Sequence, residues 1–297
     1  MIRIEHAEDR RQRAFLDTAP GEPGSGRVRY AAAMHFFQRG MLSRRALEIY
    51  RIAAKLDHED PRDALARQGH AIELTGGEAG AAAIACLVDA VDDYLSAFDG
   101  DGVQAVRDGL ARNRDGFIRP RHAERPVMVG EHLEPALRHL EAGGRAALAE
   151  AIRAAAPCLV WHTYDEYDPE RIGAAFRDGH AYASIIGESA AVPGEDYDLG
   201  LFLIAPHVFY RDHCHKAPEL YAPLTGPHGW RFGPGEPLAW LPAHTPVWNE
   251  PYRPHATKVG AVPFLCIFGW TRDVAEPATV IAADDWPRIE AMREIPA

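Results

Sequence analysis

The stretch that most constrains the fold of this chain is His213-Cys214-His215-Lys216-Ala217-Pro218-Glu219-Leu220-Tyr221. Side chains alternate between the two faces of a β-strand, so His213 and His215 are expected on one face. Pro218 predicts a bend between two strands, because proline fixes its own backbone and cannot donate a ladder hydrogen bond. Beyond the bend, Glu219 and Tyr221 again share a face. Two imidazoles, a carboxylate and a phenol should therefore converge inside a sandwich or barrel of strands.

Around this stretch, the second half of the sequence has the pattern of a β-rich domain. Aromatic residues, Pro and Gly are frequent there, and all 6 tryptophans lie in it. Short apolar runs separated by turn-forming residues predict strands over residues 159–161, 181–186, 199–205, 208–215, 220–224 and 264–270. Regular short strands between turns are typical of jelly-roll sandwiches and barrels.

The first half has a helix-forming composition, rich in Ala, Arg, Glu and Leu. Apolar residues at helical spacing predict helices over residues 27–56, 79–98, 100–114 and 132–156. Gly40 could break the first of these segments. The last segment should form two short helices, with Pro135 in the first turn and Gly143-Gly144 between them.

The expected fold class is α+β. A helical N-terminal region over residues 1–156 should be followed by a jelly-roll-like β-barrel domain over residues 157–297. That second domain should end in a short helix at residues 284–295.

The charge and length of the chain exclude some classes of function. Its 297 residues include 32 Lys and Arg against 43 Asp and Glu, a net charge of −11. This balance argues against a duplex-binding protein, whose affinity depends on basic groups that neutralise phosphates. The longest apolar run, residues 199–205, is much shorter than the roughly 20 residues of a membrane-spanning helix. The start also lacks the apolar run of a signal peptide. We therefore expect a cytoplasmic protein that acts on a small molecule, with neither nucleic acid nor membrane as partner; a homodimer is compatible with this interpretation.

The histidine-rich stretch has the residue types of a metal site. Imidazole and carboxylate ligands together suit one divalent transition metal, such as Fe, Mn, Zn, Ni or Co. The chain has 15 histidines, so an HxH pair alone would arise easily by chance, and Glu219 four positions after His215 makes the pattern more specific. A further histidine from a distant strand should complete the site. His255 is the best candidate, and His244 and His228 are the alternatives.

The spacing of these residues resembles a known sequence motif. His213-x-His215-x3-Glu219-x6-Gly226 is similar to the first motif of the cupin superfamily, although His207 stands where that motif begins with Gly. The second cupin motif is degraded: residues 251–255, which end in His255, lack its Gly, and Val259 replaces its Asn. The resemblance implies a cupin fold, a jelly-roll-like β-barrel around a metal.

Within the cupins, the pattern HxHxxxExY resembles the dimethylsulfoniopropionate (DMSP) lyases, over roughly residues 158–275. The metal ligands that this resemblance implies are His213, His215, Glu219 and His255. It further implies that Tyr221 lies beside the metal, where we expect it to act as the catalytic base, with Tyr210 as the alternative. Tyr210 resembles a second site tyrosine of the same family, and its strand parity agrees with His213 only if a bulge lies between them.

The implied reaction is the β-elimination of DMSP to acrylate and dimethyl sulfide. It requires removal of a weakly acidic proton next to a carboxylate, and a metal bound to that carboxylate stabilises the charge that develops. The ordinary pKa of a phenol is about 10, and a nearby divalent cation would lower the pKa of Tyr221 toward the range of a base. The faces of Trp230 and Trp248 are candidates for binding the sulfonium. Lys258 is a candidate for binding the substrate carboxylate.

Two other functions fit the same residues. A His-rich cupin site with open positions can activate oxygen, so an Fe(II) dioxygenase is one alternative, which oxygen consumption would distinguish. A metal-filled cupin that binds a small carboxylate without turnover is the other, with the helical half as the transmitting part. Tyr221 next to the metal favours elimination.

Overall fold

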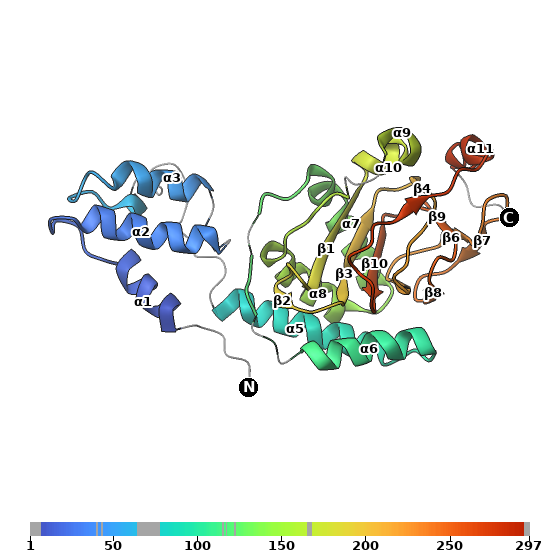
Figure 1. Cartoon of the computed structure of the whole chain (residues 1–297), viewed down its shortest axis with the longest axis horizontal. Coiled ribbons are helices and arrows are strands. Elements are labelled where there is room, and N and C mark those ends of the chain that lie inside the picture. Colours follow the sequence, from blue (N-terminus) through green and yellow to red (C-terminus); the bar gives the residue numbers. More distant parts are fainter. Residues whose placement is uncertain are drawn as a thin grey trace.

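The computed structural model of the chain describes residues 7–39, 41–42, 44–63, 78–114, 116, 118–121, 123–164 and 168–293. Most helices precede the strands along the chain (Figure 1). The helices are α1 (Ala7–Leu16), α2 (Ser25–Gln38), α3 (Arg44–Ala53), α5 (Glu78–Leu95), α6 (Asp101–Asn113), α7 (Val127–Ala142), α8 (Ala146–Ala155), α9 (Pro169–Ile172), α10 (Ala174–Asp178) and α11 (Trp286–Glu290), with a 3-10 turn η1 (Ala156–Cys158) after α8. The strands are β1 (His180–Gly187), β2 (Val192–Pro193), β3 (Asp198–Ile204), β4 (Phe209–Cys214), β5 (Glu219–Pro223), β6 (His228–Arg231), β7 (Ala239–Leu241), β8 (Val247–Asn249), β9 (His255–Lys258), β10 (Phe264–Trp270) and β11 (Thr279–Val280).

Helices α1, α2 and α3 pack on one another and stand apart from the β-sheets in Figure 1. Arg29 of α2 is only 1% exposed, and its guanidinium donates to the backbone carbonyls of Thr18 and Glu59. The Asp57 carboxylate accepts a hydrogen bond from the backbone N–H of Gly24, just before α2. This small helical unit therefore has its own apolar cluster and its own internal hydrogen bonds.

Helices α5 to α8 cover the outer face of the larger sheet. The apolar stripe of α5, which includes Leu87 and Val91, is fully buried. It belongs to one hydrophobic cluster with outward-facing sheet residues such as Leu201 and Leu220. Helices α5 to α8 and the sheet thus share a core. This core includes residues from both sides of residue 156, the predicted domain boundary.

The strands form two mostly antiparallel sheets. The larger sheet has the order β2-β1-β3-β10-β5-β8, and the smaller one has the order β11-β4-β9-β6-β7. Their inner faces share a largely aromatic cluster that includes Phe202, Tyr221 and Phe264 from the larger sheet and Tyr210 and Trp230 from the smaller one. This is the jelly-roll-like arrangement that the sequence pattern predicts. The predicted α+β fold class is confirmed.

Most predicted strands are confirmed, at β1, β3, β4, β5 and β10. The strand predicted at residues 159–161 is wrong. A 3-10 turn over Ala156–Cys158 comes directly before these residues, and the chain then makes a single bridge between His162 and Tyr182. The sequence pattern does not predict β6, β7, β8 and β9, because strands of 3 or 4 residues are too short to show an alternation.

The predicted helices are found, with different bounds. Pro135 is not in a first turn: Pro126 caps α7, the helix begins at Val127, and Pro135 lies inside it. The C-terminal helix α11 is shorter than predicted, and Gly40 lies outside the described residues. None of the helices in the described part of the chain is long and apolar enough to cross a membrane.

Candidate active site

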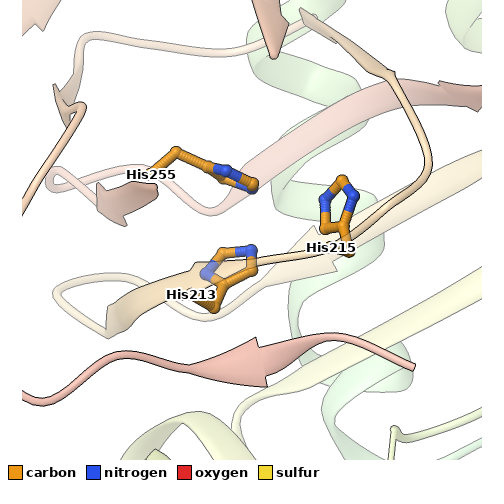
Figure 2. A group of neighbouring side chains, drawn as sticks. All are labelled: His213, His215 and His255. Atoms are coloured by element: carbon orange, nitrogen blue, oxygen red, sulfur yellow. The ribbon is translucent and has the colours of Figure 1, made fainter. Parts of the chain in front are cut away.

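Three histidines meet between the two sheets, with their rings turned toward one another (Figure 2). His213 lies on β4 directly opposite His255 on β9, and His215 follows the end of β4. The ring centroids are 4.0 Å apart for His213 and His255, and 5.0 Å apart for His215 and His255. One nitrogen of each ring lies within 4.8 Å of those of the other two, and all three residues are buried. We call these three residues the histidine cluster.

Each ring of the histidine cluster is oriented by a hydrogen bond from its Nδ1 atom to a backbone carbonyl. The distances are 2.9 Å from His213 to Arg211, 2.7 Å from His215 to Ala217 and 2.9 Å from His255 to Arg253. A carbonyl can only accept, so Nδ1 is the protonated nitrogen and donates. In a neutral ring, Nε2 then keeps a lone pair, which is how metal-ligating histidines are usually oriented. The cluster therefore fits a divalent transition metal.

Glu219 closes the histidine cluster on the side of the larger sheet. Its Oε2 atom lies 3.1 Å from His215 Nε2 and 3.4 Å from His255 Nε2, and Trp270 Nε1 donates to its Oε1 atom at 2.7 Å. Burial would raise the pKa of Glu219, but the two histidines outweigh it and lower that pKa. Burial lowers the pKa of His213, whereas contact with Glu219 overcomes burial and raises the pKa of His215. Glu219 is thus an ionised carboxylate held against the histidines, as a fourth ligand would have to be.

Two tyrosines extend this group of side chains. Tyr221 lies on β5 on the same inward face as Glu219, and its ring centroid is 6.2 Å from that of His255. Tyr210 lies on β4, where the ladder with β9 shifts register between Tyr210 and His213. This bulge turns Tyr210 to the inside, and its ring stacks on that of His213 with centroids 3.9 Å apart. The bulge that strand parity requires for Tyr210 is therefore present.

A cavity of about 240 Å³ leads to Glu219 and to both tyrosines. The residues that line it are Tyr164, Phe176, His180, Tyr182, Asp198, Phe202, Tyr210, Glu219, Tyr221, Phe268, Trp270 and residues 274–278. The last of these belong to a loop that Lys216 anchors through ion pairs with Asp273 and Glu276, at 3.1 and 2.7 Å. Most of the wall is aromatic, and burial lowers the pKa of His180 to about 4, which keeps that ring neutral. Such a cavity suits a small organic ligand.

The structure does not bring Lys258 to this cavity. Alternation along β9 turns His255 and Thr257 to the inside of the barrel and Lys258 to the outside. There the Lys258 ammonium donates to the backbone carbonyls of His207 and Glu290 and is 1% exposed. Lys258 ties β9 to the region of α11 and is not placed to bind a carboxylate in the cavity.

The two tryptophans predicted to bind the sulfonium also lie outside the cavity wall. Trp248 points outward from β8 and packs on α6, where a Cβ on Gly102 would come within 2.4 Å of its ring. Trp230 is 1% exposed and lies in the core against Tyr221, with ring centroids 5.5 Å apart. Both positions follow from strand parity and from packing, which composition alone does not reveal.

The two alternative histidines have partners elsewhere in the fold. His228 contacts the Thr225 hydroxyl and accepts a hydrogen bond from the backbone N–H of Gly260. His244 pairs with the hydroxyl of Tyr94 on α5 at 3.0 Å. Of the three candidates for the distant histidine, the structure places only His255 in the cluster.

A row of side chains on the inner face of the larger sheet contains Glu219 and further residues to which the sequence predictions assign no role. The ladders pair Asp198 with Trp270, Trp270 with Glu219, and Glu219 with Asn249. Cross-strand partners share a face, so all four point inward, and we call them the inner-face row. Asn249 is fully buried, and neither polar atom of its side chain has a hydrogen-bond partner among the described residues. A buried amide in this state calls for a water, an ion or a ligand. The sequence alone does not reveal this row, because the row depends on the pairing of four strands that are far apart along the chain.

Comparison with known proteins places the chain in a family. Its residues 105–266, more than half of its length, match the family model of dimethylsulfoniopropionate lyase. The chain is 29% identical over 136 residues to dimethylsulfoniopropionate lyase DddQ of Ruegeria pomeroyi; this match covers 46% of the chain and 66% of the relative, just under two thirds of its length.

Solved structures of the same family include chains similar to this one. The chain is similar to one in the crystal structures of the DMSP lyases RdDddP and RnDddQII, with a TM-score of 0.50 and 20% identity over 68% of this chain and 100% of that one. The structure of DMSP lyase DddQ from Ruegeria pomeroyi DSS-3 matches with a TM-score of 0.48 and 22% identity over 66% of this chain and 98% of that one. The family model spans the histidine cluster, Glu219 and both tyrosines, and the chain belongs to the dimethylsulfoniopropionate lyase family.

Proposed function

We propose that this protein is a metal-dependent lyase that cleaves DMSP to acrylate and dimethyl sulfide by β-elimination. The observation that carries the proposal is the contact between the histidine cluster and Glu219, a carboxylate that lines an aromatic cavity together with Tyr221 and Tyr210. Membership of the family supports the substrate and the type of reaction. We place the reaction in the β-rich domain over residues 157–297.

His213, His215, Glu219 and His255 would hold one divalent transition metal, such as Fe, Mn, Zn, Ni or Co. When bound, such an ion would supply positive charge to stabilise a substrate carboxylate during the reaction. The protein's own contribution is orientation: backbone carbonyls fix the three imidazole rings, and Trp270 fixes Glu219.

Tyr221 is the proposed base. Its phenolate oxygen would take the proton from the carbon next to the substrate carboxylate. The electron pair of that C–H bond forms the double bond of acrylate, and the C–S bond breaks, with its electron pair leaving on neutral dimethyl sulfide. The proton then passes from Tyr221 to solvent. Tyr210, stacked on His213, is the second candidate for this role.

The test is product analysis with the full chain. The protein is loaded with each of the candidate metals in turn and mixed with DMSP; dimethyl sulfide is measured in the headspace and acrylate in solution. We expect the two in equimolar amounts, and neither from chelator-treated protein. Oxygen uptake without dimethyl sulfide would contradict the lyase and support the dioxygenase. Binding of DMSP without any product would support a non-catalytic carboxylate-binding cupin.

A further inference from the structure

A second carboxylate lies in the wall of the cavity, two strands away from Glu219 on the same face of the larger sheet. Asp198 is the β3 member of the inner-face row, and Trp270 of β10 separates it from Glu219 on β5. Neighbouring strands are about 4.8 Å apart, so the backbones of Asp198 and Glu219 are about 10 Å apart. Both side chains line the cavity. The two carboxylates therefore line the same cavity at two separate positions.

No basic side chain among the described residues forms an ion pair with Asp198. The Ser184 hydroxyl hydrogen-bonds its carboxyl group, but the Oδ1 atom has no hydrogen-bond partner within the described residues. No ion pair with a described Lys or Arg offsets the cost of burial, which raises the pKa of Asp198 to about 7. A Cβ on Gly187 would lie 3.2 Å from Oδ1. Because residue 187 is glycine, no side chain crowds this oxygen.

Aromatic rings flank the same part of the cavity. Tyr182, Phe268 and Trp270 line it together with Asp198, and the rings of Tyr182 and Phe268 meet edge to face with centroids 6.3 Å apart. A Cβ on Gly200 would come within 2.7 Å of the Phe268 ring, so glycine at that position lets the ring lie against β3. Aromatic faces attract organic cations through their quadrupole. A carboxylate among such rings is a recognition site for an organic cation.

We propose that Asp198 is the counter-ion for the cationic group of a zwitterionic substrate, with Tyr182, Phe268 and Trp270 packed around that group. This inference rests on the proposed function, which places the substrate carboxylate at the histidine cluster beside Glu219. Two methylene groups separate carboxylate and sulfonium in DMSP, so the molecule fits between the Glu219 side and the Asp198 side of the cavity. A carboxylate ligand of the same shape that lacks the cationic group leaves Asp198 without a counter-ion, so the site should bind it more weakly.

The test compares two ligands that differ in charge alone. 3-(Trimethylammonio)propanoate carries a cation, and 4,4-dimethylpentanoate is its neutral isostere with the same carboxylate. Binding of each to the Zn²⁺-loaded full chain is measured by calorimetry at pH 8, for the wild type, Asp198→Asn and Glu195→Gln. Glu195 is an exposed acidic neighbour on the turn before β3 that does not line the cavity, so its variant removes one negative charge at a matched control position.

The wild type should prefer the cationic ligand, and Asp198→Asn should weaken that ligand by at least about tenfold while binding of the neutral ligand stays the same. Glu195→Gln should bind both ligands as the wild type does. Should Asp198→Asn fail to fold, Asp198→Ser tests the same charge.

Equal binding of both ligands to the wild type, binding of neither, or an equal loss of both in Asp198→Asn overturns the assignment. Dimethyl sulfide release from DMSP is measured on the same wild-type sample. Release without a charge preference overturns the counter-ion and leaves the lyase standing. A charge preference that Asp198→Asn abolishes, with no release, supports the counter-ion and removes the lyase.

Discussion

Two aspartates of this barrel show how differently its two sides treat a carboxylate. Asp212, on the outer side of β4, is fully buried and accepts hydrogen bonds from the Arg231 guanidinium and from Trp286 Nε1, the latter at 2.7 Å. Arg231 is 1% exposed and also donates to Asp285 at 2.8 Å. Asp198, on the inner side of β3, has the Ser184 hydroxyl and no ion pair in the described part of the chain.

Buried charged groups on the outer side therefore stabilise the fold, whereas buried groups on the inner side are available to bind a ligand. A buried carboxylate with matched donors fixes the elements around it, here β4, β6 and α11. A carboxylate or amide without them, such as Asp198 or Asn249, costs stability unless something else binds it. Changes on the inner side should therefore alter metal content, binding and turnover, and changes on the outer side should alter stability.

The largest expected effect is at the histidine cluster. His255→Ala removes one of three imidazoles, so we expect the chain to lose stoichiometric metal and, with it, dimethyl sulfide release. Metal content by mass spectrometry and turnover are the measurements. His244→Ala is the matched control, because His244 pairs with Tyr94 away from the cluster and should keep about one metal per chain. Full metal content in His255→Ala would contradict the ligand assignment.

The next effect separates the base from the metal ligands. Tyr221→Phe deletes only the phenol oxygen, so turnover should fall by about 10²–10⁴-fold, the usual contribution of a general base, while the metal stays bound. Tyr252→Phe, at a tyrosine that is 57% exposed, is the control and should keep normal rates. Near-normal turnover in Tyr221→Phe would move the role of base to Tyr210, for which Tyr210→Phe is the corresponding variant.

The metal side of the site was predictable because it depends on local spacing. The alternation of His213 and His215 and the position of Glu219 and Tyr221 after Pro218 follow from strand geometry. His255 was predicted from the resemblance to the second cupin motif. Even the inward turn of Tyr210 was expected, on the condition of a bulge that the ladder now shows.

The substrate side of the site was not predictable from the sequence. Trp248 points outward and Lys258 lies on the outer side of β9, because β8 and β9 are too short to reveal their parity. Asp198 sits beside Trp270 only through the pairing of β3 with β10, which joins residues about 70 positions apart. Long-range register, rather than residue type, decides which aromatic and acidic groups face the ligand.

On the outer side, Arg231→Met should affect stability. It leaves Asp212 buried without its charge partner, which typically costs about 3–5 kcal/mol of unfolding free energy. Urea denaturation is the measurement, and turnover per folded molecule should stay within about twofold of the wild type if the outer charges serve the fold alone. Arg288→Met is the control: this arginine pairs with the same Asp285 but is 75% exposed, so its loss should cost under about 1 kcal/mol. Equal losses of unfolding free energy in the two variants would contradict the claim that the buried charges on the outer side stabilise the fold.

The smallest effect concerns Asp198 itself and depends on pH. Burial raises the pKa of Asp198 to about 7, against about 4 for an unfolded aspartate. The folded state therefore binds this proton more tightly than the unfolded chain, so the contribution of Asp198 to stability is complete below about pH 4 and is lost as pH rises through about 7. Asp198→Asn cannot ionise and should not pay this cost. Relative to the wild type, the variant should gain about 1–2 kcal/mol of unfolding free energy between pH 4 and pH 8, a figure reduced for the partial exposure of the side chain. Urea denaturation of both proteins at the two pH values measures it, since every other titrating group cancels in the difference. A gain of the same size at pH 4 would show that the carboxylate charge is not what burial penalises, and Asp198 would then resemble the compensated Asp212.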